Sequence, residues 1–149
     1  MRGKSRKLSG FTLIELMVVV IIVGVLAVAS VPLYQGNVKR AIRSEAIATM
    51  GTIRSAHRVY RAEYGVYYDG AASGPALFEK LGLGEDALTD VAYFAADCYD
   101  LVDADSQSFT IRVQSTAGND GSRAAQVRGY WPNGTTVATM THTGIVEEN

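Results

Sequence analysis

The sequence Gly10-Phe11-Thr12-Leu13-Ile14-Glu15-Leu16 is followed by an apolar run that extends as far as Tyr34. No residue from Leu16 to Leu33 carries a charge. A helix of these eighteen residues is about 27 Å long, close to the hydrocarbon thickness of a bilayer. The stretch therefore predicts a membrane-spanning helix with one carboxylate, Glu15, near its start.

Glu15 is costly at membrane depth. A lone carboxylate there raises the free energy of insertion by about 2.5 to 3.5 kcal/mol. Such a group is retained when a positive charge pairs with it. In this sequence the nearby cations are the basic residues before Gly10, or a new amino terminus produced by cleavage after Gly10. The position of Glu15 therefore indicates a partner cation.

The string from Gly10 to Leu16, followed by an unbroken apolar helix, resembles the processing signal of type IV pilins and type II secretion pseudopilins. The resemblance implies that a prepilin peptidase cuts between Gly10 and Phe11, and that Phe11 is then N-methylated. It also implies that Glu15 meets the amino terminus of a neighbouring subunit during assembly. These three residues are therefore the candidate processing and assembly site.

Two ordinary alternatives for residues 1–34 are a cleaved secretory signal and a plain signal anchor. A secretory signal has an apolar core of about 7 to 15 residues, followed by a small-residue cleavage site. The run in this chain is longer and begins with a glutamate, which does nothing for a signal peptide, although Ala27-Val28-Ala29 is a rival cleavage site. The pilin-type signal is the better interpretation.

The leader, residues 1–10, carries four basic residues and no acidic one. By the positive-inside rule these charges keep the amino terminus in the cytoplasm, so the head is expected in the periplasm. Of the 14 Lys and Arg residues, removal of the leader leaves ten against 15 Asp and Glu residues, a side-chain net charge of −5. This balance argues against general nucleic-acid binding, which needs a basic patch or stripe.

Gly24 and Pro32 interrupt the apolar run. A proline inside a helix removes one backbone hydrogen bond, so a kink is expected between Val28 and Pro32. Because related pilins resemble this chain in having glycine and proline at such positions, Gly24 to Pro32 is also a candidate for helix loss in a fibre. From Asn37 to about Glu63 the apolar residues recur every three or four positions, which predicts an amphipathic continuation of the helix.

Gly65 is expected to end this helix, because glycine suits the left-handed conformation after a last turn. A short helix is predicted at 75–81. Turns are predicted at 118–121 and, as a two-residue hairpin, at Asn133-Gly134. Four stretches rich in β-branched and aromatic residues predict strands: Val91 to Leu101, Ser108 to Gln114, Ala124 to Trp131 and Thr135 to His142.

These elements predict an α+β fold in which a long amino-terminal helix packs on a carboxy-terminal antiparallel sheet of about four strands. The expected organisation is a leader at 1–10, a transmembrane and assembly helix at 11–35, its amphipathic continuation at 36–64, and a head of loops and sheet at 65–149. A head of this size has a marginal core of its own. It is expected to pack on the amphipathic half of the helix.

The sequence shows no catalytic constellation. His57 and His142 have no partner at metal-ligand spacing, and the single cysteine, Cys98, is expected to be a buried small hydrophobe. The disulfide loop of many pilins is therefore not expected, and neither is a cofactor. A calcium site is a minor alternative, since some pseudopilins carry one, and its candidates are Asp97, Asp100, Asp103, Asp105, Glu147 and Glu148.

The resemblance implies a non-enzymatic structural subunit of a type IV pilus, which resides in the bacterial inner membrane and polymerises through its amino-terminal helix into an extracellular filament. Its expected partners are copies of itself, prepilin peptidase and the assembly machinery. A pseudopilin of a type II secretion system is the alternative within the family. The alternative from another class is a signal-anchored extracytoplasmic enzyme or binding module, which would need a catalytic constellation or deep pocket in residues 65–149.

Overall fold

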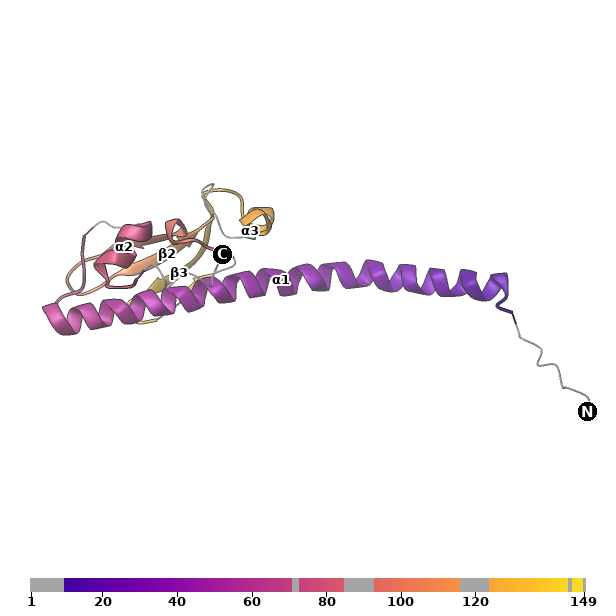
Figure 1. Cartoon of the computed structure of the whole chain (residues 1–149), viewed down its shortest axis with the longest axis horizontal. Coiled ribbons are helices and arrows are strands. Elements are labelled where there is room, and N and C mark those ends of the chain that lie inside the picture. Colours follow the sequence, from indigo (N-terminus) through magenta and orange to yellow (C-terminus); the bar gives the residue numbers. More distant parts are fainter. Residues whose placement is uncertain (1–9, 71–72, 85–92, 116–123, 145, 149) are drawn as a thin grey trace, which may run out of the picture. The chain divides into compact units, whose positions relative to one another are not determined.

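The computed structural model describes residues 10–70, 73–84, 93–115, 124–144 and 146–148. The chain divides into two compact units, Met1–Val38 and Lys39–Asn149, and helix α1 (Leu13–Tyr64) contributes to both. The other described elements belong to the second unit. They are α2 (Gly74–Lys80), the 3-10 helix η2 (Ala96–Cys98), β1 (Tyr99–Val102), β2 (Thr110–Gln114), α3 (Ala124–Tyr130), β3 (Thr136–Thr141) and β4 (Val146–Glu148) (Figure 1).

In the first unit α1 is apolar around its whole circumference. The helix continues without interruption through Gly24 and Pro32. Every large apolar side chain from Phe11 to Tyr34 is exposed, by 49% to 77%. Among the described residues, α1 is the one helix long and apolar enough to cross a membrane. Such a surface is stable when a membrane or other apolar helices cover it, because exposed apolar area is unfavourable in water.

In the second unit the sheet covers the apolar stripe of α1 (Figure 1). The stripe consists of fully buried residues three or four positions apart: Ile42, Ala46, Met50 and Ile53. On the sheet side, the buried residues alternate along and just before β2, namely Phe109, Ile111 and Val113, while Thr110 and Arg112 between them are half-buried. The predicted packing of the sheet on the amphipathic half of the helix is confirmed.

The four strands form one antiparallel sheet in the order β1-β2-β3-β4. Tyr99 of β1 pairs with Val113 of β2, and Ile111 of β2 pairs with Met140 of β3. The β2–β3 register shifts between Val113 and Gln114. The α+β fold class with a four-stranded antiparallel sheet is therefore confirmed.

The prediction of a strand from Ala124 to Trp131 is wrong, because this segment forms helix α3 and the residue after it. Alanine, glutamine and arginine in the segment favour a helix. Val127 and Trp131, four residues apart, are both buried, as they are on one side of a helix. The fourth strand of the sheet is instead β4, which the sequence pattern does not indicate.

The predicted hairpin at Asn133-Gly134 is wrong for a related reason, since α3 and not a strand comes before it. The two residues still form a turn, in which Gly134 has a φ of 82°. The Gly134 N–H donates a hydrogen bond to the Ser115 carbonyl at 2.6 Å, so the turn is tied to the end of β2. The turn predicted at 118–121 lies outside the described residues.

The strand predicted from Val91 to Leu101 begins later than expected, at Tyr99. Its first two residues lie outside the described part of the chain, and η2 comes directly before β1. The backbone N–H groups of Tyr93 and Phe94 donate to Glu45 Oε1 at 2.8 and 3.2 Å. These bonds hold the segment against α1 and so keep it out of the sheet.

The predicted helix ends agree with the structure. Helix α1 ends at Tyr64, and Gly65 follows with a φ of 80°. The short helix predicted at 75–81 is α2, and Gly82 after it has a φ of 67°. Both glycines adopt the left-handed conformation that closes a helix. Tyr67 then returns to the apolar stripe and is buried there.

Candidate functional site

Glu15 lies in the first turn of α1, and its carboxylate is bonded to the residue before the helix. Glu15 Oε2 accepts hydrogen bonds from the Thr12 backbone N–H at 2.9 Å and from the Thr12 hydroxyl at 2.7 Å. Thr12 Oγ1 in turn accepts the Glu15 backbone N–H at 3.3 Å. This reciprocal arrangement is a capping box, which satisfies backbone donors that a first helical turn leaves unpaired.

The capping box is readable in the sequence as Thr-x-x-Glu before an apolar run, and the sequence-based interpretation missed it. It gives Glu15 a structural role within a single chain, in addition to its expected role between chains. Both hydrogen bonds from Thr12 fall on Oε2. The other carboxylate oxygen, Oε1, can therefore face a cation from another chain while the cap stays formed.

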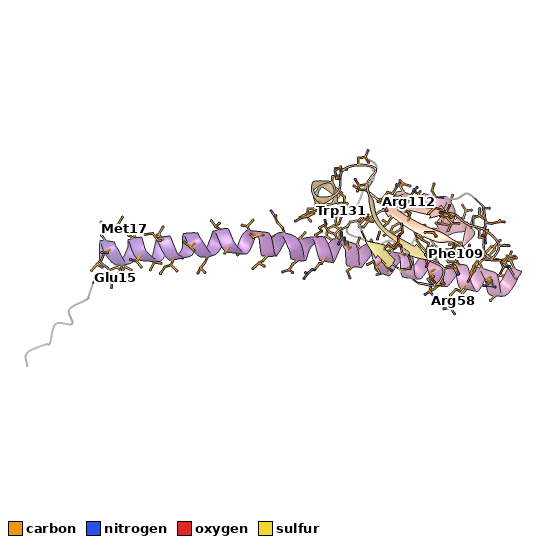
Figure 2. The ribbon with its side chains drawn as sticks, turned by 180° about the vertical axis from the view of Figure 1, so that it is seen from behind. Glu15, Met17, Arg58, Phe109, Arg112 and Trp131 are labelled. Atoms are coloured by element: carbon orange, nitrogen blue, oxygen red, sulfur yellow. The ribbon has the colours of Figure 1, made fainter. Side chains whose placement is uncertain are left out.

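Gly10 and Phe11 come directly before α1 and are not helical. Phe11 is 76% exposed, and no atom lies within 4 Å of the place where a Cβ on Gly10 would be. Both residues are therefore exposed at the start of α1. The predicted cleavage point lies within five residues of Glu15 in the sequence. Glu15 itself lies at the amino-terminal end of α1 (Figure 2).

The residues considered for calcium are distributed over several elements and the turns between them. Asp100 Oδ2 pairs with Arg112 Nη2 at 3.0 Å across β1 and β2. Asp105 accepts the backbone N–H groups of Gln107 and Ser108, both at 2.7 Å, and these bonds lower the pKa of its carboxyl. The others are placed apart along the chain: Asp97 in η2, Asp103 after β1, and Glu147 and Glu148 in β4.

No group of three or more His, Cys, Asp or Glu side chains in the described ranges is arranged to hold a metal ion. Cys98 is fully buried, as predicted. His57 is also fully buried, which the sequence-based interpretation missed. The signal was available, because His57 follows Ile53 by four positions and so continues the buried stripe of α1.

The His57 ring is part of an aromatic cluster between α1 and the sheet. It stacks on Phe109 with ring centres 4.2 Å apart, and the Tyr67 ring lies 6.3 Å away. Burial lowers the pKa of His57 to about 4, because a charged imidazolium is poorly solvated in an apolar surrounding. His57 is therefore a neutral core residue at pH 7.

Comparison with known proteins agrees with the geometry at the start of α1. A family model described as the prokaryotic N-terminal methylation motif matches residues 5–31. Fimbrial protein EcpB of Eikenella corrodens is 31% identical over 119 residues, which cover 76% of this chain and 71% of that protein. No solved structure matches the chain.

Two further relatives match over shorter segments. Type II secretion system core protein G of Vibrio cholerae is 41% identical over 64 residues, 43% of this chain and 44% of that protein. Type IV major pilin protein PilE1 of Neisseria gonorrhoeae is 43% identical over 67 residues, 45% of this chain and 31% of that protein. The chain thus spans less than half of the length of these two curated relatives.

Three observations agree on the family of this chain. They are the long apolar helix that begins with a capped glutamate, the methylation motif, and the relative that matches over most of both chains. The chain belongs to the family of type IV pilins and type II secretion pseudopilins. Proteins of this family are structural subunits that assemble into filaments with a pilus or secretion machinery. A membrane-anchored precursor fits the exposed apolar part of α1.

Proposed function

We propose that this chain is the subunit of a type IV pilus. The observation that carries the choice is the extent of the match to EcpB, which covers 76% of the chain. Residues 1–64 are less than half of the chain, so this match includes part of the head. The match to core protein G covers only 43% of the chain. Pilins and pseudopilins differ in the head, and likeness in the head therefore favours the pilus.

Processing in this proposal begins with cleavage between Gly10 and Phe11 by prepilin peptidase, followed by N-methylation of Phe11. Cleavage creates a cationic amino group at the end of the apolar segment. In the filament this group pairs with Glu15 of a neighbouring copy, on the side of Oε1. Removing one member of a buried charge pair costs about 3 to 5 kcal/mol, so the pairing selects the correct offset between neighbouring copies.

The apolar side chains from Phe11 to Tyr34 supply the driving force. Burial of each large apolar side chain contributes about 1.5 to 3 kcal/mol. In the precursor the bilayer covers them, with the basic leader in the cytoplasm and the head in the periplasm. In the extracellular filament the helices of other copies cover them. The same apolar surface thus contacts lipid in the precursor and the helices of other copies in the filament.

The segment from Gly24 to Pro32 is proposed to lose helix in the filament. Pro32 has no N–H, so the carbonyl of Val28 has no helical partner there. The hydroxyl of Ser30 donates to the carbonyl of Ala27 at 2.9 Å, a side-chain bond that competes with the backbone ladder. We expect faster amide exchange at 24–32 than at 13–23 in assembled filaments.

The choice between pilus and secretion system is tested by deleting the gene and restoring it. In the deletion strain we expect surface filaments to disappear from sheared fractions while secretion of exoproteins continues. Restoring the gene should return filaments that contain this chain. Loss of secretion with filaments unchanged would assign the chain to a secretion system instead. A purely cell-associated protein with a measurable hydrolytic activity would instead favour a signal-anchored enzyme.

A further inference from the structure

The second unit has a basic end, defined by Lys39, Arg40 and Arg128. Lys39 and Arg40 belong to α1, and Arg128 belongs to α3. Trp131, just after α3, brings the two helices together, because Lys39 Nζ lies 5.0 Å from the centre of its ring. Arg128 comes three residues before Trp131 and so lies beside the same contact. No acidic residue occurs in α3 or between Lys39 and Ser44 of α1.

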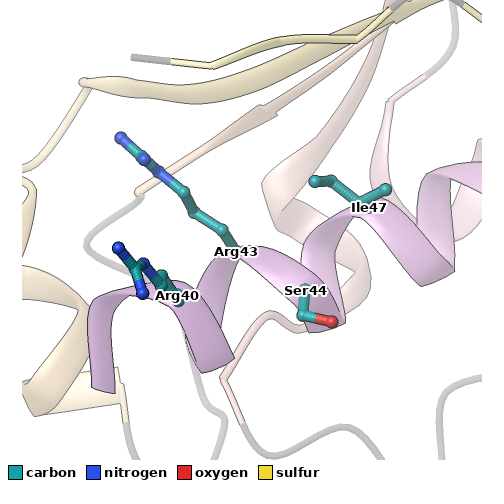
Figure 3. A pocket seen from close by; sticks show the side chains of 4 residues that line it. All are labelled: Arg40, Arg43, Ser44 and Ile47. Atoms are coloured by element: carbon teal, nitrogen blue, oxygen red, sulfur yellow. The ribbon is translucent and has the colours of Figure 1, made fainter. Parts of the chain in front are cut away.

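The arginines of the basic end are available to a partner. Arg40 lies one helical turn before Arg43, and both line a pocket with Ser44 and Ile47 (Figure 3). Arg43 Cζ lies 5.4 Å from the centre of the Trp131 ring, so Arg43 is held within its own chain. Arg40 and Arg128 are exposed, and their side chains form no ion pair or hydrogen bond with another described residue.

The opposite end of the second unit is acidic. This acidic end consists of four exposed carboxylates, those of Glu63, Asp69, Asp103 and Asp105. Glu63 lies in the last turn of α1, and Asp69 follows that helix. The other two lie in the loop between β1 and β2. The Tyr67 N–H donates to the Ser106 carbonyl at 3.2 Å, which holds this loop beside the residues after α1.

The acidic end is not neutralised by its own chain. Among the described residues, none of its four carboxylates forms an ion pair. Two backbone N–H groups of its own loop lower the pKa of Asp105, which therefore stays ionised. Of the arginines late in α1, Arg61 has its Cζ 4.7 Å from the centre of the Tyr67 ring. Arg58 projects from the side of α1 that faces away from the sheet (Figure 2).

The two ends are too far apart to pair within one chain. Arg40 and Glu63 are 23 residues apart in α1, a rise of about 35 Å. Salt screens exposed charges over about 8 Å at physiological ionic strength. The basic end and the acidic end can therefore meet their opposite charge only on another molecule. Because each end complements the other, a second copy of this chain supplies the matching surface.

We infer that the basic end of one copy binds the acidic end of the next copy in the assembled filament. A head-to-tail contact uses different surfaces on its two partners, so it repeats without closing and gives an open fibre. Complementary charges also reject a copy that approaches in the reverse direction. This inference rests on the assembly of the chain into filaments and names a contact between their subunits. It applies to a pilin and to a pseudopilin.

Lys39 permits a direct test, because Lys39 and Lys80 are the lysines outside the leader. A carbodiimide joins a lysine amine to a carboxylate without a spacer, so the two groups must be in contact. A link between Lys39 and the acidic end joins two chains, because these groups lie at opposite ends of one chain. Sheared filaments and isolated membranes of the unaltered chain are treated, and linked peptides are identified by mass. We expect links from Lys39 to the acidic end, and fewer of them at high salt.

Charge reversal tests the same contact without relying on lysine chemistry. Arg40→Glu and Glu63→Lys each reverse one exposed charge, and a lysine in the last turn of a helix is favourable. Each substitution alone should lower the yield of assembled chain about tenfold, because an attraction becomes a repulsion. The double variant should regain most of the yield, because its two ends are again complementary. Arg58→Glu reverses an exposed arginine outside the basic end and should assemble as the unaltered chain does.

Three results would overturn the inference. One is the absence of links from Lys39 to the acidic end in samples whose carboxylates couple to an added amine. Another is a double variant that assembles no better than either single variant. The third is a link from Lys39 to a different protein in place of a second copy, which would make the basic end a contact with the assembly machinery. If the chain belongs to a secretion system, the expected links appear in membranes and not in sheared filaments, so failure of the pilus proposal is distinguishable.

Discussion

Glu15 caps its own helix through Thr12 and, in the proposed filament, faces the amino group of a neighbouring copy. Substitution separates the two roles. Glu15→Ala removes both, while Thr12→Ala removes only the hydroxyl of the cap, at a cost of about 1 kcal/mol. We expect Glu15→Ala to be cleaved normally and to give few filaments, and Thr12→Ala to assemble. Precursor mass and the yield of sheared filaments measure this, and a normal yield from Glu15→Ala would remove the proposed role of the carboxylate.

His57 gives the head a pH-dependent stability. The pKa of His57 is about 4 in the folded chain, against an ordinary value of 6.5. Between these two pH values the unfolded chain binds more protons at His57 than the folded chain does. The free energy of unfolding should therefore be highest above pH 6.5 and fall as the pH is lowered towards 4, by up to about 3 kcal/mol.

Chemical unfolding of the full chain in detergent, followed by Trp131 fluorescence, measures this dependence. His57→Phe keeps an aromatic ring on Phe109 and should remove the dependence in that pH range. Asp105 contributes at lower pH, because its pKa lies below the ordinary 3.8 and its stabilisation is lost as the carboxyl is protonated. If the unfolding free energy of His57→Phe depends on pH in the same way as that of the unaltered chain, a group other than His57 titrates in this range.

At the scale of elements, Glu45 joins α1 to the segment before β1. Glu45→Ala leaves the N–H groups of Tyr93 and Phe94 without their carboxylate acceptor, which should cost about 1.5 to 3 kcal/mol of unfolding free energy. Glu63→Ala removes an exposed glutamate from the same helix and should change stability by less than about 0.5 kcal/mol. Equal effects of the two substitutions would contradict the role of these hydrogen bonds.

Elements with a strong local period were predictable from the sequence. Helix α1, β2 and the helix ends at Gly65 and Gly82 follow from apolar spacing and from glycine placement. Helix α3 was not predictable from the sequence, because seven residues are too few to display a helical period. In addition, Val127, Gly129 and Tyr130 are poor helix formers. The contacts of Glu45 and the cations over Trp131 join residues far apart in sequence, which no local pattern reveals.

The candidate site was predictable to a similar degree. The motif from Gly10 to Glu15 is enough to indicate the family, because its residue types and spacing are specific. The capping role of Glu15 was legible but overlooked. The placement of Lys39 and Arg43 over the Trp131 ring was not predictable, because Trp131 comes from a different part of the chain and only the fold brings the three residues together.

At the scale of the whole molecule, the chain combines an apolar segment that needs covering with a head whose core is completed by the buried stripe of α1. The apolar segment is exposed along its whole length in the single chain. The head buries a contiguous aromatic and aliphatic core on α1. This arrangement fits a subunit whose apolar segment is covered first by the bilayer and then by the helices of its neighbours, while its head keeps the same fold.

The decisive measurement is the mass of the chain recovered from sheared surface filaments. We expect a polypeptide that begins at Phe11 and carries one added methyl group at its amino terminus. Filaments that lack this chain, or that contain it with any other first residue, would contradict the account, because the cation proposed to pair with Glu15 would then be absent from its place.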